Sequence, residues 1–443
     1  MRRLYNQSRY KEAENLARKK IDNNTQSEFA RDIIVRSLYN QKNWLGVEEF
    51  STQYPSDKNQ PYSRKARQKR IGQATHVDAE PETNLEKVWD GENLLSNWHQ
   101  ENNKLWLRHE NGWTYWIMPN EFSLKQTHPS LLYLALEVLL SPWYPGVKNW
   151  KAPSKRVGEK IALSYSGGVD STAAALLLPG KTILAYHKRD FESMLTHDLA
   201  NHVFSAWKNK MNREVIVIPS NHERIRTYHG SSLGFSTDNA AGVHLILLAD
   251  YLNLCGIAFG TPIDNTWLKR GSAYRDFSSS YYFRYWSKQF AKAGLEYVLP
   301  TNHISEAGAL MICKQSKISS SINSCLRGDG TKWCGNCWKC FHKNGPLGRK
   351  FNPNSKEITK FLNTTPLRTA QHVLWALKKQ NLGHLVPHLA PYMESDLSWW
   401  EQAYPKGLEI ISEELRDGIK NETELYLTWM EKPYRLESVY LDI

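Results

Sequence analysis

The sequence lacks several features that define other classes of protein. The most apolar stretch, near residues 131–140, contains Glu137 and is too short to cross a bilayer. The first residues, Met-Arg-Arg-Leu-Tyr-Asn-Gln, include no apolar signal region. No Gly-x4-Gly-Lys-Ser/Thr string occurs, so a Walker-type loop is not indicated. We therefore expect a cytoplasmic protein without a membrane segment.

Acidic residues are outnumbered by basic ones, 45 Asp and Glu against 57 Lys and Arg, which gives a net charge of +12. The excess is spread along the chain, so it suits small anionic ligands and leaves nucleic-acid binding open. A length of 443 residues with 41% hydrophobic residues predicts two to three domains with a substantial core.

The most informative stretch is residues 161–172, Ile-Ala-Leu-Ser-Tyr-Ser-Gly-Gly-Val-Asp-Ser-Thr. Strand-like residues enter a turn with two glycines, and the turn leads into the helix-forming run Ala-Ala-Ala-Leu-Leu-Leu. The glycines let a ligand approach the main chain, and the helix N-terminus offers free N–H groups to an anion such as phosphate. Asp170 fits such a site if a magnesium ion accompanies the phosphate.

The string at 166–171, Ser-Gly-Gly-Val-Asp-Ser, resembles the PP-loop signature of the ATP pyrophosphatases. The resemblance implies that ATP and Mg²⁺ bind there, that AMP is transferred to an oxygen of the substrate, and that pyrophosphate leaves. It makes Asp170 and Ser171 the candidate catalytic residues. The candidate ATP-binding residues are Ser166, Gly167, Gly168, Val169, Asp170, Ser171, Tyr186, His187 and Gly260.

Strand and helix patterns alternate from about residue 157. The predicted strands are 160–164, 182–186, 214–218, 256–260 and 297–299, with helices notably at 195–210 and 239–254. This alternation predicts an α/β fold with a doubly wound parallel sheet, of the adenine nucleotide alpha hydrolase type that the PP-loop implies. Ligands bind at the carboxyl ends of such strands, where Tyr186, His187 and Gly260 lie.

Four of the six cysteines fall within sixteen residues, at Cys325, Cys334, Cys337 and Cys340. Thiolates at Cys-x2-Cys spacing bind a metal from a tight turn, and four of them complete a tetrahedral zinc site. An iron–sulfur cluster and a redox pair are alternatives, and His342 could replace one thiol. Disulfides are disfavoured in the expected compartment. We expect Cys255 and Cys313 to be ordinary core residues.

A PP-loop followed by Cys-x8-Cys-x2-Cys-x2-Cys resembles the 7-cyano-7-deazaguanine synthase family of queuosine biosynthesis, over residues 161–340. The resemblance implies an acid substrate, a small molecule or a modified base, that is adenylated and then attacked by ammonia or another nitrogen donor. Zinc would lie close to the substrate pocket.

Two departures from that family weaken the substrate assignment. A Pro-Gly-Arg-Asn-like string of the family appears here as Phe-Ser-Thr-Asp-Asn-Ala at 235–240. No lysine follows Pro300 until Lys314. The nucleotide chemistry is therefore better supported than the deazaguanine substrate.

The flanking regions lie outside this resemblance. Residues 1–55 repeat Leu-Tyr-Asn-Gln with a 34-residue offset, at 4–7 and 38–41, which resembles tetratricopeptide repeats and implies a protein partner. Residues 56–82, with a basic run, are predicted to be a linker. We expect a small α+β extension at 83–156 with a hairpin around Asn111-Gly112, the PP-loop domain with its zinc motif at 157–350, and a helical region at 351–443.

Two other functions stay open. A PP-loop sugar amidotransferase or tRNA thiolation enzyme would transfer nitrogen or sulfur, and thiolation would need a cysteine outside the four clustered ones. A repeat-bearing scaffold that only binds a nucleotide is the non-enzymatic alternative. Candidate helpers of lower weight are Lys188, Arg189, Arg270 and Arg275 for the phosphates, and Asp264 and Asn265 for the substrate.

Overall fold

The computed structural model describes residues 1–22, 27–56, 58–73, 80–83, 88–193, 198–328 and 332–443. The chain divides into two units. The smaller comprises Met1–Asp78 with Glu192–Leu195, and the larger comprises Ala79–Phe191 with Thr196–Ile443. Within the described part of the chain, every helix is too short or too polar to cross a membrane.

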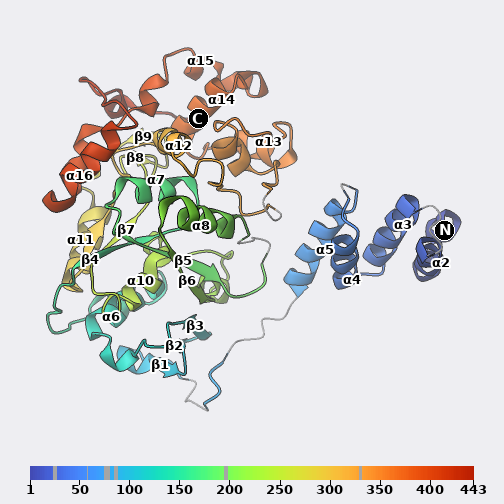
Figure 1. Cartoon of the computed structure of the whole chain (residues 1–443), viewed down its shortest axis with the longest axis horizontal. Coiled ribbons are helices and arrows are strands. Elements are labelled where there is room, and N and C mark those ends of the chain that lie inside the picture. Colours follow the sequence, from blue (N-terminus) through green and yellow to red (C-terminus); the bar gives the residue numbers. More distant parts are fainter. Residues whose placement is uncertain (23–26, 57, 74–79, 84–87, 194–197, 329–331) are drawn as a thin grey trace. The chain divides into compact units, whose positions relative to one another are not determined.

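An eight-stranded sheet organises the larger unit, in the order β1-β2-β3-β6-β5-β4-β7-β10 (Figure 1). The strands from β6 to β10 in that order pair in parallel. Because β4 is first among them in sequence and central in the sheet, the topological switch point lies beside it. These strands are β4 (Lys160–Ser164), β5 (Ile183–Arg189), β6 (Val215–Ser220), β7 (Leu254–Phe259) and β10 (Glu296–Val298).

Helices cover both faces of the parallel strands. Figure 1 shows α7 (Val169–Leu177) and α8 (Asp198–Met211) on one side, with α6 (Pro129–Leu140) and α10 (Val243–Leu247) on the other. Right-handed crossovers on each side of the switch point require this division. Ala162 and Leu163 of β4 are fully buried, as expected for a strand covered on both faces. The predicted α/β class with a mostly parallel sheet is confirmed.

One predicted helix in this unit is wrong in extent. Instead of a helix over 239–254, the chain forms a 3-10 turn at Asp238–Gly242 and the short helix α10, which ends at Leu247. Asn253 then takes a left-handed conformation, with φ of +54°, and β7 begins at the next residue. Residues 248–253 therefore form turns between the helix and the strand, and their apolar composition does not distinguish a turn from a helix.

The predicted hairpin is present as β2 (Lys104–His109) and β3 (Gly112–Ile117), and β1 (Trp98–Glu101) adds a third antiparallel strand. The sequence suggested a separate small extension, but the hairpin belongs to the main sheet. Trp116 of β3 pairs with Ser220 of β6, so the antiparallel strands continue the parallel sheet. The pairing covers the carboxyl end of β6, at Ser220.

The smaller unit consists of helices. These are α1 (Arg2–Asn6), α2 (Tyr10–Asp22), α3 (Ser27–Asn40), α4 (Trp44–Gln53) and α5 (Gln60–Gln73). Helix α2 packs on α3, and α4 packs on α5. The aligned aromatic residues Tyr10 and Trp44 both begin helices, so the 34-residue offset corresponds to a repeated helix pair.

The linker predicted at 56–82 is corrected over Gln60–Gln73, which form α5. Ala66 of this helix is fully buried in the core of the smaller unit, and the ring of Tyr62 lies 5.5 Å from that of Tyr39. Its many basic residues suggested a tether, but apolar contacts on one face are enough to fix a helix. Residues 74–79 of the predicted linker lie outside the described residues.

The C-terminal part of the chain is helical with many 3-10 turns, and it shares the core of the larger unit. Trp375 and Leu377, for example, are buried in that core. The remaining elements are α9 (Ile225–Tyr228), β8 (Leu268–Lys269), β9 (Ala273–Tyr274), α11 (Tyr281–Lys292), α12 (Glu306–Gln315), α13 (Lys356–Leu362), α14 (Ala370–Lys379), α15 (Ala390–Met393) and α16 (Glu413–Glu424).

Candidate functional site

The glycine loop, residues 166–171, runs from the end of β4 into the first turn of α7, at the carboxyl end of the sheet. Gly167 has φ of +74°, a conformation that side chains disfavour, and Gly168 is the residue before α7. The hydroxyl oxygens of Ser166 and Ser171 lie 2.9 Å apart, and the backbone N–H of Ser166 donates to Ser171 Oγ at 3.1 Å. These bonds curve the loop over the start of the helix.

Gly260 lies against this loop at the end of β7. A Cβ at this position would lie 2.8 Å from Ser171 Cα and 2.9 Å from the carbonyl carbon of Asp170. Only glycine allows β7 and the first turn of α7 to approach this closely.

A cavity of about 290 Å³, the loop cavity, opens beside the glycine loop. Six predicted residues line it, while Gly167, Gly168 and Val169 do not. Aromatic side chains from three separate segments supply flat apolar surface. The predicted lining residues are Ser166, Asp170, Ser171, Tyr186, His187 and Gly260, and the further aromatic ones are Tyr165, Phe235 and Phe259.

Glu223 is a cavity residue that the sequence did not indicate. Its carboxylate contacts His187 Nε2 at 3.1 Å and Arg189 Nη2 at 2.5 Å, and all three side chains are nearly buried. Of the other proposed helpers, Lys188, Arg270 and Arg275 do not line the cavity. Arg275 instead donates to backbone carbonyl groups, at 2.6 Å for Thr266.

A buried ionic network lies behind the glycine loop. Lys343 Nζ is 2.7 Å from Asp170 Oδ1 and 2.8 Å from Glu306 Oε2. The backbone N–H of Glu306, at the start of α12, donates to Asp264 Oδ2 at 2.8 Å. Lys343 is only 6% exposed, so its charge must be balanced by these neighbours.

Burial and neighbouring charges shift the pKa values of the three carboxyl groups in this network in different directions. Burial and the charge of Glu306 raise the pKa of Asp264 well above its ordinary value. Burial also opposes ionisation of Glu306, but Lys343 and His342 outweigh it and hold its pKa well below the usual range. The pKa of Asp170 is raised by burial, although Lys343 opposes the shift. Asp170 therefore shares one ammonium with a stronger competitor.

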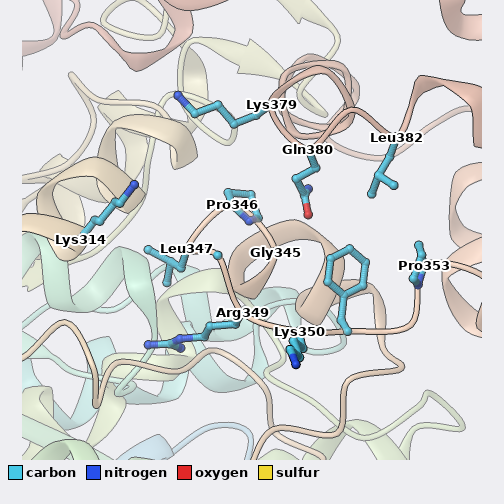
Figure 2. A pocket seen from close by; sticks show the side chains of 12 residues that line it. Lys314, Gly345, Pro346, Leu347, Arg349, Lys350, Pro353, Lys379, Gln380 and Leu382 are labelled. Carbon is cyan, nitrogen blue, oxygen red and sulfur yellow. The ribbon is translucent and has the colours of Figure 1, made fainter.

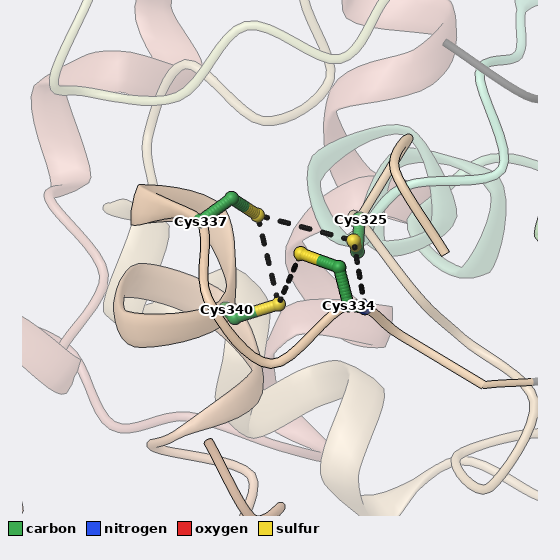
Figure 3. Close-up of side chains that lie close together, drawn as sticks. All are labelled: Cys325, Cys334, Cys337 and Cys340. Carbon is green, nitrogen blue, oxygen red and sulfur yellow. Dashed lines mark hydrogen bonds between the residues drawn. The ribbon is translucent and has the colours of Figure 1, made fainter. Parts of the chain in front are cut away.

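The four clustered cysteines converge on one point (Figure 3). Their Sγ atoms lie 3.6 to 3.9 Å apart in the pairs Cys325–Cys337, Cys334–Cys340 and Cys337–Cys340. Four sulfurs about 2.3 Å from a central zinc would lie about 3.8 Å from one another, whereas a disulfide needs about 2.05 Å. This four-cysteine cluster could hold a metal ion such as zinc, as the spacing predicted.

The four-cysteine cluster is connected to the glycine loop through its flanking residues. Ser324 Oγ accepts the backbone N–H of Val169 at 3.0 Å, and Leu326 lines the loop cavity. Lys343 follows Cys340 within the π-helical turn Cys340–Asn344. These contacts could not be predicted from the sequence, because Ser324 and Lys343 are ordinary residues more than 150 positions from the loop.

His342 does not join the four-cysteine cluster, contrary to the alternative raised by the sequence. It lies with Glu306 and His372 in a buried group whose ligand atoms fall within 4.8 Å of one another. A metal ion there would face the ammonium of Lys343, and His372 Nε2 is already 3.0 Å from the carbonyl oxygen of His342. We therefore assign the positive charge at this place to Lys343.

A second, wider pocket of about 490 Å³ is formed by residues 345–353, α14 and the end of α12 (Figure 2). This basic pocket is lined by Lys314, Arg349, Lys350 and Lys379. Arg349 donates to the carbonyl oxygen of Ser319 at 2.9 Å, and Lys379 pairs with Glu401 at 2.8 Å. Two of its four cations are therefore engaged within the protein.

Part of the chain matches a known protein family. Residues 285–434 match a family described as a family of unknown function (DUF6395). The matched stretch includes Glu306, the four-cysteine cluster and Lys343, and it leaves the glycine loop outside. No curated protein and no solved structure matches the chain.

Proposed function

We propose that this chain is an ATP-using enzyme of the PP-loop type that resembles the 7-cyano-7-deazaguanine synthases. It would transfer AMP from ATP to an oxygen of a carboxylate or carbonyl substrate, release pyrophosphate, and then let a nitrogen nucleophile displace AMP. The observation that supports this most is the glycine loop, packed against Gly260 and opening into a cavity lined by Asp170 and aromatic rings.

The residues of the loop cavity fit a magnesium-bound nucleotide. The rings of Tyr186, Phe235 and Phe259 offer surface to a flat base, and the hydroxyls of Ser166 and Ser171 can donate to phosphate oxygens. Asp170 would hold the metal ion, which neutralises charge on the departing pyrophosphate. The carboxylate suits this task because its only described partner, Lys343, is shared with Glu306.

The proposed acyl transfer proceeds in two steps. The substrate carboxylate attacks the α-phosphorus, the α–β phosphoanhydride bond breaks, and pyrophosphate leaves. An amine then attacks the acyl carbon, AMP leaves with the bonding electron pair, and the amine loses a proton. A bare carboxylate is a poor electrophile, so the first step makes the second one fast.

Nitrogen transfer is favoured over sulfur transfer by the two remaining cysteines. Cys313 is buried, and burial raises the pKa of its thiol. Cys255 Sγ donates to the carbonyl oxygen of Lys160, at the opposite end of β4 from the glycine loop. Neither residue lines the loop cavity.

The decisive experiment is product identification. The protein would be incubated with ATP, Mg²⁺, ammonium and a panel of carboxylic acids that includes 7-carboxy-7-deazaguanine. We expect AMP and pyrophosphate, and Asp170→Asn should lower their formation about 100-fold or more, since it removes charge from the metal site. Asp417→Asn, an exposed position on α16, is the matched control and should have no effect.

Formation of ADP and phosphate would refute the PP-loop proposal. Binding of ATP without any turnover across the panel would favour the scaffold alternative. Full activity of Asp170→Asn would remove the metal role from Asp170.

A further inference from the structure

We propose that the metal of the four-cysteine cluster governs ATP binding at the glycine loop, through two direct links made by Ser324 and Lys343. This inference rests on the proposed function, because it concerns the same loop. It adds two positioning residues and a form of regulation that neither the glycine loop nor the four-cysteine cluster implies by itself.

The first link replaces a helix cap. Gly168, the residue before α7, offers no side-chain cap to the helix. The hydroxyl of Ser324 takes that place by accepting the N–H of Val169 at 3.0 Å. Because Ser324 directly precedes Cys325, the position of the capping group follows the position of a metal ligand.

The second link is the ion pair between Lys343 and Asp170, with 2.7 Å between Nζ and Oδ1. Lys343 lies three residues after Cys340 in the π-helical turn Cys340–Asn344. The turn is tied to the four-cysteine cluster again by Asn344, whose Nδ2 lies 3.7 Å from Cys340 Sγ. The carboxylate that would hold Mg²⁺ is therefore oriented by a side chain anchored at the metal.

Metal binding would stabilise the conformation in which Ser324 and Lys343 make these two contacts. Four thiols 3.6 to 3.9 Å apart make only weak contacts with one another, so their convergence depends on a central ion. Loss of the ion would release Ser324 and Lys343 from both sides of the cluster. Since coupling between two binding sites is reciprocal, ATP bound at the glycine loop would in turn retain the metal.

The test measures zinc release rather than turnover. Zinc-loaded protein is mixed with a coloured zinc chelator in excess Mg²⁺, with and without α,β-methylene ATP, which cannot be cleaved between the α and β phosphates. We expect the nucleotide to slow zinc release from the unmodified protein about fivefold or more. The Ser324→Ala/Lys343→Gln variant should still contain about one zinc per chain, but the nucleotide should no longer slow its release.

Lys350→Gln is the matched control, since Lys350 lies on the same segment and is exposed; it should retain the full effect. Calorimetric titration of the analogue gives the separate readout for the nucleotide site. An analogue that does not bind the unmodified protein contradicts the proposed function. An analogue that binds without slowing zinc release overturns the coupling alone, as does a double variant that keeps the effect.

If the double variant does not fold, the reverse effect can be measured on the unmodified chain. The affinity for the analogue is measured before and after zinc removal and after zinc is restored. We expect affinity to fall at least fivefold on removal and to recover on restoration. Equal affinity in the two states would refute the coupling.

Discussion

The loop cavity and the basic pocket differ in how their charges are held. The basic pocket is wider, about 490 Å³ against about 290 Å³, and four cations line it. Yet Arg349 and Lys379 are engaged within the protein, while Lys314 and Lys350 extend into solvent. In the loop cavity, the side chains of Asp170, His187, Arg189 and Glu223 are buried or half-buried and lie 2.5 to 3.1 Å from partners on other elements, while Asp238 is exposed.

The number of charged residues in a pocket is therefore a poor guide to whether the pocket is a functional site. An exposed lysine keeps its hydration and its freedom, so it binds an anion weakly. A buried, oriented group acts in a low dielectric and does not have to reorganise when a ligand arrives. The smaller cavity is therefore the better candidate for chemistry, although the total charge of +12 draws attention to lysines.

Between the two pockets, the largest expected difference in ligand affinity comes from displacing the glycine loop. Gly260→Ala places a methyl group within 2.8 to 2.9 Å of the backbone of Asp170 and Ser171, so the glycine loop must move. We expect affinity for the ATP analogue to fall ~10- to 100-fold, corresponding to the ~1–3 kcal/mol of an overpacked site. Gly180→Ala, with no atom within 4 Å of the added carbon, is the control. Unchanged affinity of Gly260→Ala would mean that the loop does not bind the nucleotide.

The next effect in size is an expected loss of unfolding free energy at acid pH, which arises from buried histidines. Burial lowers the pKa of His244 to about 4 and that of His303 to about 3. Both would titrate near 6.5 when unfolded, so their contribution to stability is complete above pH 6.5 and decreases as the pH falls below it. At pH 5.5 each should have lost about 1.4 kcal/mol of unfolding free energy.

His244 lies beside the loop cavity, since its Nε2 approaches the carbonyl oxygen of Ala185 in β5, next to Tyr186. His303 lies in the core near α16, where its Nε2 is 2.8 Å from Thr423 Oγ1. Histidine is absent from the basic pocket's lining among the described residues. Urea unfolding at pH 7.5 and 5.5 measures the total loss, to which the buried His109, His222 and His372 also contribute. His303→Asn should reduce this total by about 1.4 kcal/mol. A midpoint that does not change with pH would contradict the burial of neutral imidazoles.

The smallest effect belongs to the basic pocket. Removing the two solvent-exposed cations, Lys314→Ala/Lys350→Ala, should change the unfolding free energy by less than about 0.5 kcal/mol. AMP formation should stay within about twofold of the unmodified protein, because neither side chain touches the loop cavity. A tenfold loss of AMP formation would contradict the assignment of the chemistry to the loop cavity alone and would make the basic pocket part of the site.

The sequence predicted the sheet better than its surroundings, for a physical reason. Strand β4 coincides with the predicted 160–164 because a strand buried on both faces is a continuous apolar run bounded by a glycine turn. Helix α5 was missed because packing through Tyr62 and Ala66 outweighs its basic composition. The attachment of β3 to β6 depends on pairing between distant segments, which local patterns do not encode.

The candidate site divides in the same way. The glycine loop and the four cysteines are local motifs with fixed spacing, and both lie where the sequence placed them. The network of Asp170, Asp264, Glu306 and Lys343 joins residues as many as 173 positions apart, and each is an ordinary charged residue in its own segment. Its existence depends on tertiary folding, so only the structure could reveal it.

The pairing of β3 with β6 has a consequence for the behaviour of the protein in concentrated solution. A bare β6 would present a row of unpaired backbone donors and acceptors to any passing strand, including β6 of another copy. The antiparallel strands extend the sheet beyond β6, so that its edge strand is β1, which is only four residues long. Deleting the hairpin is therefore expected to produce self-association together with a loss of stability, because Leu105, Leu107 and Trp116 belong to the core of the parallel strands.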